Sequence, residues 1–185
     1  MKLIELFKVP LFVAVLDLDT KSIEKYCLDH QDKDDGRILT NVGGYQSHEV
    51  KISPLVREIN KYLNVFSGSH AIDKKLVIAH MWININEFKD YNITHFHTNA
   101  LFSGVYYVKT PDKCGNIIFE NPSSDVMIHN YGGVNFKEYN VFNSVTHWQS
   151  AKENTLYVFP GWLKHRVGPN LSNEKRISIS FNISY

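Results

Sequence analysis

The second half of the chain is the part that most restricts the fold. From Leu76 onward it consists of short apolar and β-branched runs, separated by glycine, proline and asparagine. The expected strands are Leu76–Asn86, Val105–Val108, Asn116–Glu120, Leu156–Phe159 and Arg176–Tyr185. Many short strands at this spacing are typical of a β-sandwich or barrel. We therefore predict a mainly β fold with a jelly-roll core over residues 76–185.

Residues 1–75 have a mixed pattern, in which helices accompany a strand. The expected elements are a strand at Leu11–Leu18, a helix at Ser22–His30 capped by Thr20, and a helix from Pro54 to Phe66. We predict that this region supports the jelly roll, so that residues 1–185 form one α+β domain. At 185 residues with 43% hydrophobic side chains, the chain has enough material for one buried core.

The composition argues against several classes of protein. Twenty basic and nineteen acidic residues leave a formal charge of +1, without the basic excess of a dedicated nucleic-acid binder, although a nucleic-acid substrate stays open. Cys27 and Cys114 lie in unrelated contexts and are expected to be free thiols. The longest apolar run near the amino end, Leu11 to Leu16, is too short to cross a bilayer. We expect a cytoplasmic protein, while the pattern says nothing of its oligomeric state.

Three histidines are the main candidates for chemistry. His95 and His97 are two residues apart, so on an extended strand both imidazoles point to the same face. His165 follows the turn residues Pro160 and Gly161, and in a jelly roll such a late turn can fold back beside a strand from the middle of the chain. Imidazole nitrogens bind iron, zinc, copper and nickel alike. We predict that these three histidines bind one metal ion.

The last strand also carries polar side chains on one face. The residues of that face are Arg176, Ser178, Ser180 and Asn182. One interpretation is that they face solvent. The other is that they face the barrel interior, where Arg176 would form a bidentate pair with a carboxylate and Ser178 would add a hydroxyl. A dicarboxylate held between a metal and an arginine requires the second interpretation.

Together these motifs resemble the 2OG-Fe(II) oxygenase family found in phages and marine bacteria. The resemblance rests on Trp82–Ile85, on His95 with His97, on Ser103–Val108, Phe159–His165 and Arg176–Asn182, and on the earlier segment Thr40–Ser47. It implies a double-stranded β-helix core that holds iron(II), with 2-oxoglutarate as co-substrate and O2 as oxidant. It further implies hydroxylation of an unknown primary substrate with release of succinate and CO2. A phage-encoded member would act in the host cytoplasm.

The same resemblance assigns roles to individual residues. His95 and His165 would be metal ligands, and Arg176 with Ser178 would bind the far carboxylate of 2-oxoglutarate. Tyr107 and Asn84 are further candidates for contacts with 2-oxoglutarate. The chain departs from the wider superfamily at His97, where an Asp or Glu ligand is usual. Either His97 is the third ligand, which we favour, or a carboxylate such as Glu120 takes that place.

The segment Ser123–Ala151 shows little pattern, and loops of this length in compact domains are often functional. We therefore predict a lid over the site, with His129, Tyr131 and Trp162 as possible substrate contacts.

Two other functions remain open. The histidine pair and the Pro160–His165 segment also resemble the two boxes of cupins, so a three-histidine cupin-type metalloenzyme without 2-oxoglutarate is one alternative. A non-enzymatic jelly-roll module, such as a virion component or a carbohydrate binder, is the other.

Overall fold

The strand at the carboxyl end shows how sequence alternation builds this fold. In the computed structural model, which describes residues 1–185, the strand β11 spans Arg176–Ser184. One face of β11 lies in the main hydrophobic core and consists of Ile177, Ile179, Phe181 and Ile183. The opposite face lines an internal cavity with Ser178, Ser180 and Asn182. Because side chains alternate across a strand, one short segment serves both the core and the cavity.

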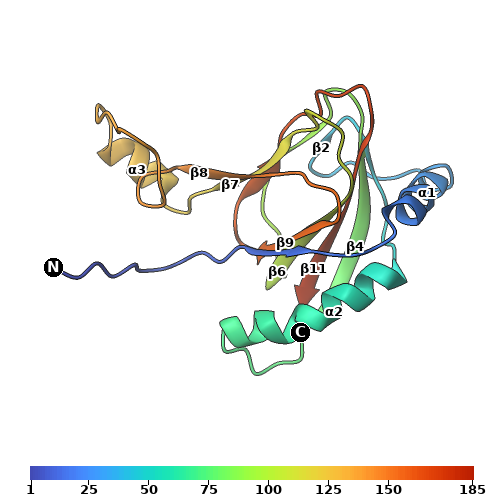
Figure 1. The fold of residues 1–185 in the computed structure, drawn as a ribbon, viewed down its shortest axis with the longest axis horizontal. Helices are drawn as coiled ribbons and strands as arrows, with labels where there is room; N and C mark the ends of the chain where they lie inside the picture. The colour runs from blue at the N-terminus through green and yellow to red at the C-terminus, as the bar shows by residue number, and fades with distance from the viewer.

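Two antiparallel sheets make up most of the molecule (Figure 1). The six-stranded sheet has the order β1-β9-β6-β11-β4-β3, and the five-stranded sheet has the order β2-β5-β10-β7-β8. The first sheet comprises β1 (Phe12–Val15), β3 (Tyr45–Gln46), β4 (Val77–Asn86), β6 (Phe102–Lys109), β9 (Thr155–Pro160) and β11. The second comprises β2 (Asn41–Val42), β5 (Tyr91–His95), β7 (Asn116–Glu120), β8 (Thr146–Ser150) and β10 (His165–Val167). The mainly β architecture with helices at its side is as predicted.

Two of the three helices pack against the outer face of the six-stranded sheet. They are α1 (Thr20–Gln31) and α2 (Ser53–Ser69), and their apolar residues Ile23, Cys27, Leu55, Ile59 and Phe66 join the same core cluster as β11. The prediction that Thr20 caps α1 is wrong, because the Asp19 side chain accepts the Ser22 N–H at 3.1 Å. None of the helices is both long and apolar enough to span a bilayer.

A second, smaller core lies between the two sheets. It comprises Val105, Tyr107, Ile117, Phe119, Tyr157, Phe159 and Leu163. The alternate residues of β6, such as Tyr106 and Val108, belong to the main core instead. The strand β6 is therefore buried on both faces, which explains why it reads as an almost continuous apolar run.

The segment expected to be an unpatterned loop, Ser123–Ala151, has more structure than predicted. It contains a short helix, α3 (Ser124–Asn130), and the edge strand β8. Residues of β8 pair in register with β7, for example Trp148 opposite Ile118. The strand β8 forms because it pairs with β7. Its own sequence shows no alternation of buried and exposed residues, since its first three residues are all exposed. The segment projects from the body of the molecule beyond the ends of β7 and β8 (Figure 1).

Candidate metal centre

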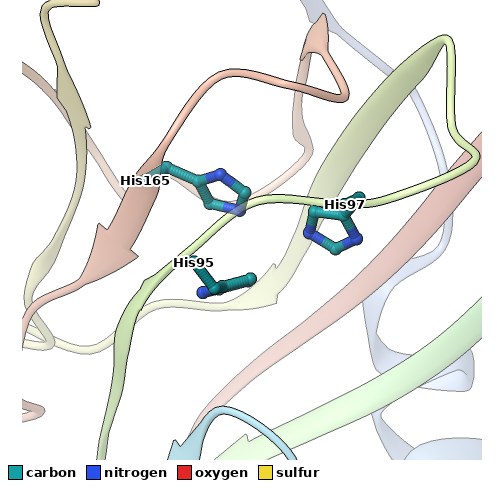
Figure 2. A group of neighbouring side chains, drawn as sticks. All are labelled: His95, His97 and His165. Atoms are coloured by element: carbon teal, nitrogen blue, oxygen red, sulfur yellow. The ribbon is translucent and has the colours of Figure 1, made fainter.

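Three imidazoles converge between the two sheets, as the sequence predicted. His95 ends β5, His97 follows in the next loop, and His165 begins β10 (Figure 2). The strands β5 and β10 are antiparallel neighbours with His165 directly opposite His95, and their ring centroids lie 4.4 Å apart. One ligand nitrogen from each of the three rings lies within 4.8 Å of the others. Three nitrogens at these separations can contact a common cation after small side-chain rotations.

The position of His97 differs from the expectation, because β5 ends at His95 and does not carry both histidines. The loop is held instead by the turn before His165. The His97 N–H donates to the Gly161 carbonyl at 2.9 Å, and the Gly161 N–H donates to the Leu101 carbonyl at 3.0 Å. A Cβ atom at Gly161 would lie 2.2 Å from the Ala100 carbonyl oxygen, so only glycine allows this approach. The glycine thus joins the segments that carry His97 and His165.

Hydrogen bonds select one tautomer for two of the rings. The Nδ1–H of His95 donates to the Ile93 carbonyl at 2.7 Å, and that of His165 donates to the Leu163 carbonyl at 2.9 Å. A carbonyl can only accept, so each Nδ1 carries the proton and each Nε2 keeps a free lone pair. Such backbone contacts commonly orient metal-binding histidines.

Burial keeps all three imidazoles neutral. It lowers the pKa of His95, and burial together with the neighbouring His95 lowers the pKa of His97 to about 4. Burial and the same neighbour lower the pKa of His165 to about 3. Only the neutral ring has a lone pair for a metal, so these side chains are in their ligand form at neutral pH.

The carboxylate alternative, Glu120, does not join this cluster. Its Oε1 accepts a hydrogen bond from the Thr94 hydroxyl at 3.0 Å. It does not line the cavity around the histidines, and the group of potential metal ligands there contains only the three imidazoles. The donor set that the fold brings together is therefore neutral.

Arg176 is almost fully buried, with 1% of its surface exposed. Its Nη1 donates to the carbonyls of Cys114 and Gly168, the latter at 2.9 Å. Its Nε and Nη2 have no hydrogen-bond partner and no carboxylate forms an ion pair with it, although Asp90 is near enough to favour its charge. Burial lowers the pKa of Arg176, although arginine stays charged at neutral pH. Two parallel N–H groups aimed at one side of a guanidinium are the arrangement that a carboxylate fits.

The other predicted co-substrate residues lie near this guanidinium. Ser178 is two residues further along β11 and lines the cavity. Tyr107 is its partner in the β6–β11 register, lines the cavity, and has a buried hydroxyl without a partner. Asn84 also lines the cavity, and its Nδ2 donates to the Ser180 hydroxyl at 3.0 Å. Arg176 itself does not line the cavity, so the buried Tyr107 hydroxyl is the unsatisfied donor on the cavity wall, and the unpartnered nitrogens of Arg176 lie on the strand end next to it.

The cavity around the histidines has a volume of about 370 Å³. None of its lining residues comes from Ser123–Ala151, so His129 and Tyr131 lie outside it and the expected lid does not cover this site. The reason is that the hairpin of β7 and β8 carries the segment away from the body (Figure 1). Trp162 does not line the cavity either and is 54% exposed.

Sequence reasoning missed one wall of the cavity. The region expected to act only as support also contributes to the lining, through Arg37, Leu39, Thr40, Gln46 and Glu49. Gln46 lies beside Asn84 in the pairing of β3 with β4, which brings the wall to the six-stranded sheet. No periodic pattern marks these residues, and the Thr40–Ser47 resemblance could have indicated only Thr40 and Gln46 among them.

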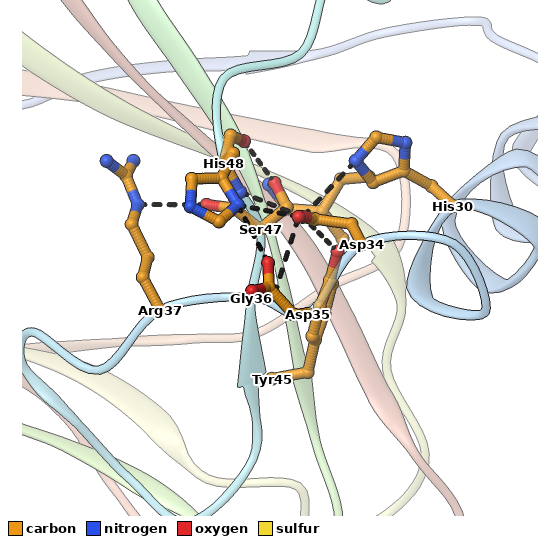
Figure 3. A network of polar contacts seen from close by, with 9 residues as sticks. His30, Asp34, Asp35, Gly36, Arg37, Tyr45, Ser47 and His48 are labelled. Carbon is orange, nitrogen blue, oxygen red and sulfur yellow. Dashed lines mark hydrogen bonds and ion pairs between the residues drawn. The ribbon is translucent and has the colours of Figure 1, made fainter.

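A network of hydrogen bonds holds this wall in place (Figure 3). The Asp34 carboxylate accepts from the Tyr45 hydroxyl at 2.6 Å, from the His48 N–H at 2.9 Å and from His48 Nδ1 at 2.6 Å. Asp34, Asp35 and His48 also place potential metal-ligand atoms within 4.8 Å of one another. Both oxygens of Asp34 are already engaged, however, so we interpret the group as structural.

Replacing Asp34 with asparagine is expected to lower the free energy of unfolding at pH 7 by about 2–3 kcal/mol, because charged acceptors are lost. Burial raises the pKa of Asp34, but hydrogen bonds from Tyr45 and His48 outweigh it and hold the pKa well below its usual range. The stabilisation is thus present above the unfolded pKa of about 3.9 and is lost as the pH falls below it. Urea denaturation of wild type and Asp34→Asn at pH 7 and pH 3 should show the difference shrinking in acid.

The neighbouring variant Asp35→Asn is the control for this measurement, since the Asp35 side chain is 92% exposed. Its effect should stay within about 0.5 kcal/mol at both pH values. Equal penalties for the two substitutions would contradict the role of Asp34.

The fold and the cluster together define a jelly-roll protein with a candidate metal site of three histidines. A family model described as "Putative 2OG-Fe(II) oxygenase" matches residues 80–182, more than half of the chain. The chain therefore belongs to this family, whose members depend on iron(II) and 2-oxoglutarate. A sequence search of the curated proteins finds no match.

Solved structures with the same fold include several oxygenases. A prolyl-4-hydroxylase from Pseudomonas putida is 11% identical with a TM-score of 0.65, over 95% of this chain and 92% of that one. HygX from Streptomyces hygroscopicus, with nickel and 2-oxoglutarate bound, is 8% identical with a TM-score of 0.62, over 95% and 83%. The viral collagen prolyl hydroxylase of Paramecium bursaria Chlorella virus-1, in its 2OG complex, is 14% identical with a TM-score of 0.57, over 94% of each chain. At these identities the likeness shows the fold, a double-stranded β-helix.

Proposed function

We propose that the chain is an iron(II)- and 2-oxoglutarate-dependent hydroxylase in which His95, His97 and His165 hold the metal. Arg176, Ser178 and Tyr107 would bind the far carboxylate of 2-oxoglutarate, and Asn84 would contact the co-substrate from β4. When bound, iron with 2-oxoglutarate and O2 supplies the oxidising chemistry of the class. One oxygen atom goes to the primary substrate as a hydroxyl and the other to succinate, with release of CO2.

The observation that carries this proposal is the buried guanidinium of Arg176, which forms no ion pair and stands on β11 next to Ser178, a residue that lines the histidine cavity. A buried cation without a partner is costly, since desolvation is offset only when an opposite charge is near. Its Nε and Nη2 are free, as is the Tyr107 hydroxyl. An anionic ligand with a carboxylate at this end would satisfy all three donors. A three-histidine cupin-type enzyme has no need for such a group.

The neutral ligand set supports an anionic co-substrate. Three neutral imidazoles contribute no negative charge, so both positive charges of a divalent metal ion must be balanced by another ligand or a nearby anionic group. Glu49 is the one carboxylate among the residues that line the cavity, and its side chain is 64% exposed. A dianion such as 2-oxoglutarate would therefore compensate both the metal and Arg176. The sheets above and below the cluster would keep water from it.

Supplying the purified protein with iron(II), ascorbate and 2-oxoglutarate should yield slow succinate formation even without a primary substrate. Succinate can be followed by NMR, and 2-oxoglutarate binding by calorimetry on protein loaded with nickel(II). Absence of both succinate and binding would overturn the proposal. Metal binding without any 2-oxoglutarate binding would favour the cupin-type alternative.

A further inference from the structure

The wall formed by residues 37–49 lies outside the matched region 80–182, so it is a part of the cavity that the family match does not cover. It meets the polar face of β4 and β11, where Asn84, Ser180 and Asn182 contribute short neutral side chains. The metal ligands come from β5, the loop after it and β10, and the co-substrate residues come from β4, β6 and β11, so none of them belongs to this wall. This wall is therefore placed to contact whatever else enters the cavity.

Arg37 is the one arginine or lysine among the 26 residues that line the cavity. It is half-buried, its backbone N–H donates to the Gln46 carbonyl at 2.8 Å, and its Nε donates to the Ser47 carbonyl at 3.0 Å. It forms no ion pair, and its two terminal nitrogens carry no contact in Figure 3. A guanidinium held by its Nε, with both terminal nitrogens free, can bind a carboxylate through two N–H groups.

The Asp34 network fixes this guanidinium without neutralising it. Asp34 accepts from Tyr45 and His48, which flank the Gln46–Ser47 backbone that contacts Arg37. The carboxylate is therefore engaged with other donors and does not pair with the arginine. A binding group that is already positioned loses less entropy when its ligand arrives.

Gln46 adds an acceptor next to the cation. It is 3% exposed and lines the cavity, and its Oε1 is buried without a hydrogen-bond partner. An unsatisfied buried acceptor calls for an N–H or O–H donor on the ligand. The backbone hydrogen bond between Arg37 and Gln46 makes the two residues direct neighbours. The wall thus offers a free cation and a free acceptor side by side.

Building on the proposed function, we propose that Arg37 and Gln46 form the subsite for the primary substrate, and that this substrate is a free α-amino acid. Its carboxylate would pair with Arg37, and its amino group would donate to Gln46. A single cation matches a singly charged carboxylate, whereas a phosphate dianion would require more positive charge than this wall holds. Glu49, the one carboxylate of the lining, is already in contact with His80 at 3.2 Å, and the remaining polar lining of Asn84, Ser180 and Asn182 suits a small polar side chain.

The test is calorimetry on protein loaded with nickel(II) and 2-oxoglutarate, so that binding is measured without turnover. The probes are the twenty standard L-amino acids, their primary amides, and phosphoethanolamine. At least one amino acid should bind, and its amide should bind at least about tenfold more weakly. Arg37→Gln should weaken amino-acid binding roughly 10- to 100-fold, because a charge-assisted hydrogen bond is lost.

Two further variants keep the result interpretable. Gln46→Leu, which is of similar size and removes the acceptor without adding a charge, should weaken amino-acid binding about tenfold, because the amino group then has no partner. Arg57→Gln, an exposed arginine on α2 away from the cavity, should change nothing. All variants should bind 2-oxoglutarate as wild type does, which shows that they are folded.

Three outcomes would overturn the subsite: normal 2-oxoglutarate binding with no amino acid bound, equal binding of acids and amides, or an unchanged affinity in Arg37→Gln. Stronger binding of phosphoethanolamine than of any amino acid would overturn the substrate class. Failure of wild type to bind 2-oxoglutarate would instead contradict the proposed function, and the subsite would fall with it.

Discussion

Replacing His165 with alanine is expected to lower the affinity for iron(II) by more than about 100-fold and to abolish succinate formation. Changes to groups that merely orient a metal ligand cost about 10- to 100-fold in affinity, and loss of a ligand should cost more. His165 is also the most buried of the three histidines, with 4% of its surface exposed, so no water-exposed side chain can readily replace it. Titration of the metal-free protein with cobalt(II), followed by visible absorbance, measures the affinity directly.

Two controls separate a ligand role from a general loss of structure. His70→Ala removes an exposed imidazole at the end of α2 and should leave metal binding unchanged. Glu120→Gln tests the carboxylate alternative and should also leave it unchanged, because that carboxylate already accepts from Thr94. Wild-type affinity in His165→Ala, or a loss in Glu120→Gln as large as that in His97→Ala, would contradict the three-histidine assignment.

The second large effect is expected at Arg176. Replacing it with methionine should weaken 2-oxoglutarate binding by about 2–5 kcal/mol, or roughly 30- to 5000-fold, which is the range measured when one partner of a buried charge pair is removed. Metal affinity should not change, since Arg176 does not belong to the histidine cluster. Calorimetry with 2-oxoglutarate and a separate cobalt titration distinguish the two effects.

The stability of the ligand-free variant provides an independent readout. Arg176 carries a buried charge with two unpartnered nitrogens, so a methionine of similar length should cost little stability or even increase it. Wild type should gain thermal stability when 2-oxoglutarate is added to the metal-loaded protein, and Arg176→Met should not.

Lys175→Met, one residue earlier with a side chain that is 39% exposed, is the matched control and should respond as wild type does. An undiminished 2-oxoglutarate affinity in Arg176→Met would exclude the proposed carboxylate contact.

The strands of the jelly roll were predicted well where alternation or burial left a strong local signal. The expected Asn116–Glu120 matches β7 residue for residue, and the expected Arg176–Tyr185 differs from β11 only by its last residue. The predicted convergence of the three histidines is also found. The interior interpretation of the polar face of β11 is supported because Ser178, Ser180 and Asn182 line the cavity.

Other features were missed because their cause is not local. The strands β5 and β10 are short and lack a clear alternation, and they exist because each pairs with a neighbour far along the chain. The prediction of a strand through His97 was wrong for the same reason. That residue lies in a loop whose path is set by the Gly161 carbonyl, 64 residues later in the chain.

What the sequence determined by itself is which residues have the right chemistry and which strands present them. Periodicity is a property of neighbouring residues, so it is readable from the chain without knowing the fold. What only the tertiary structure decided is how distant groups meet: that no carboxylate joins the three imidazoles, that Arg176 is buried beside the cavity without an ion pair, and that Arg37 and Gln46 line the same cavity. For the residues on strands, such as His95, His165, Arg176 and Gln46, these relations depend on the register of strands far apart in sequence, and a shift of one residue would turn their side chains to the other face.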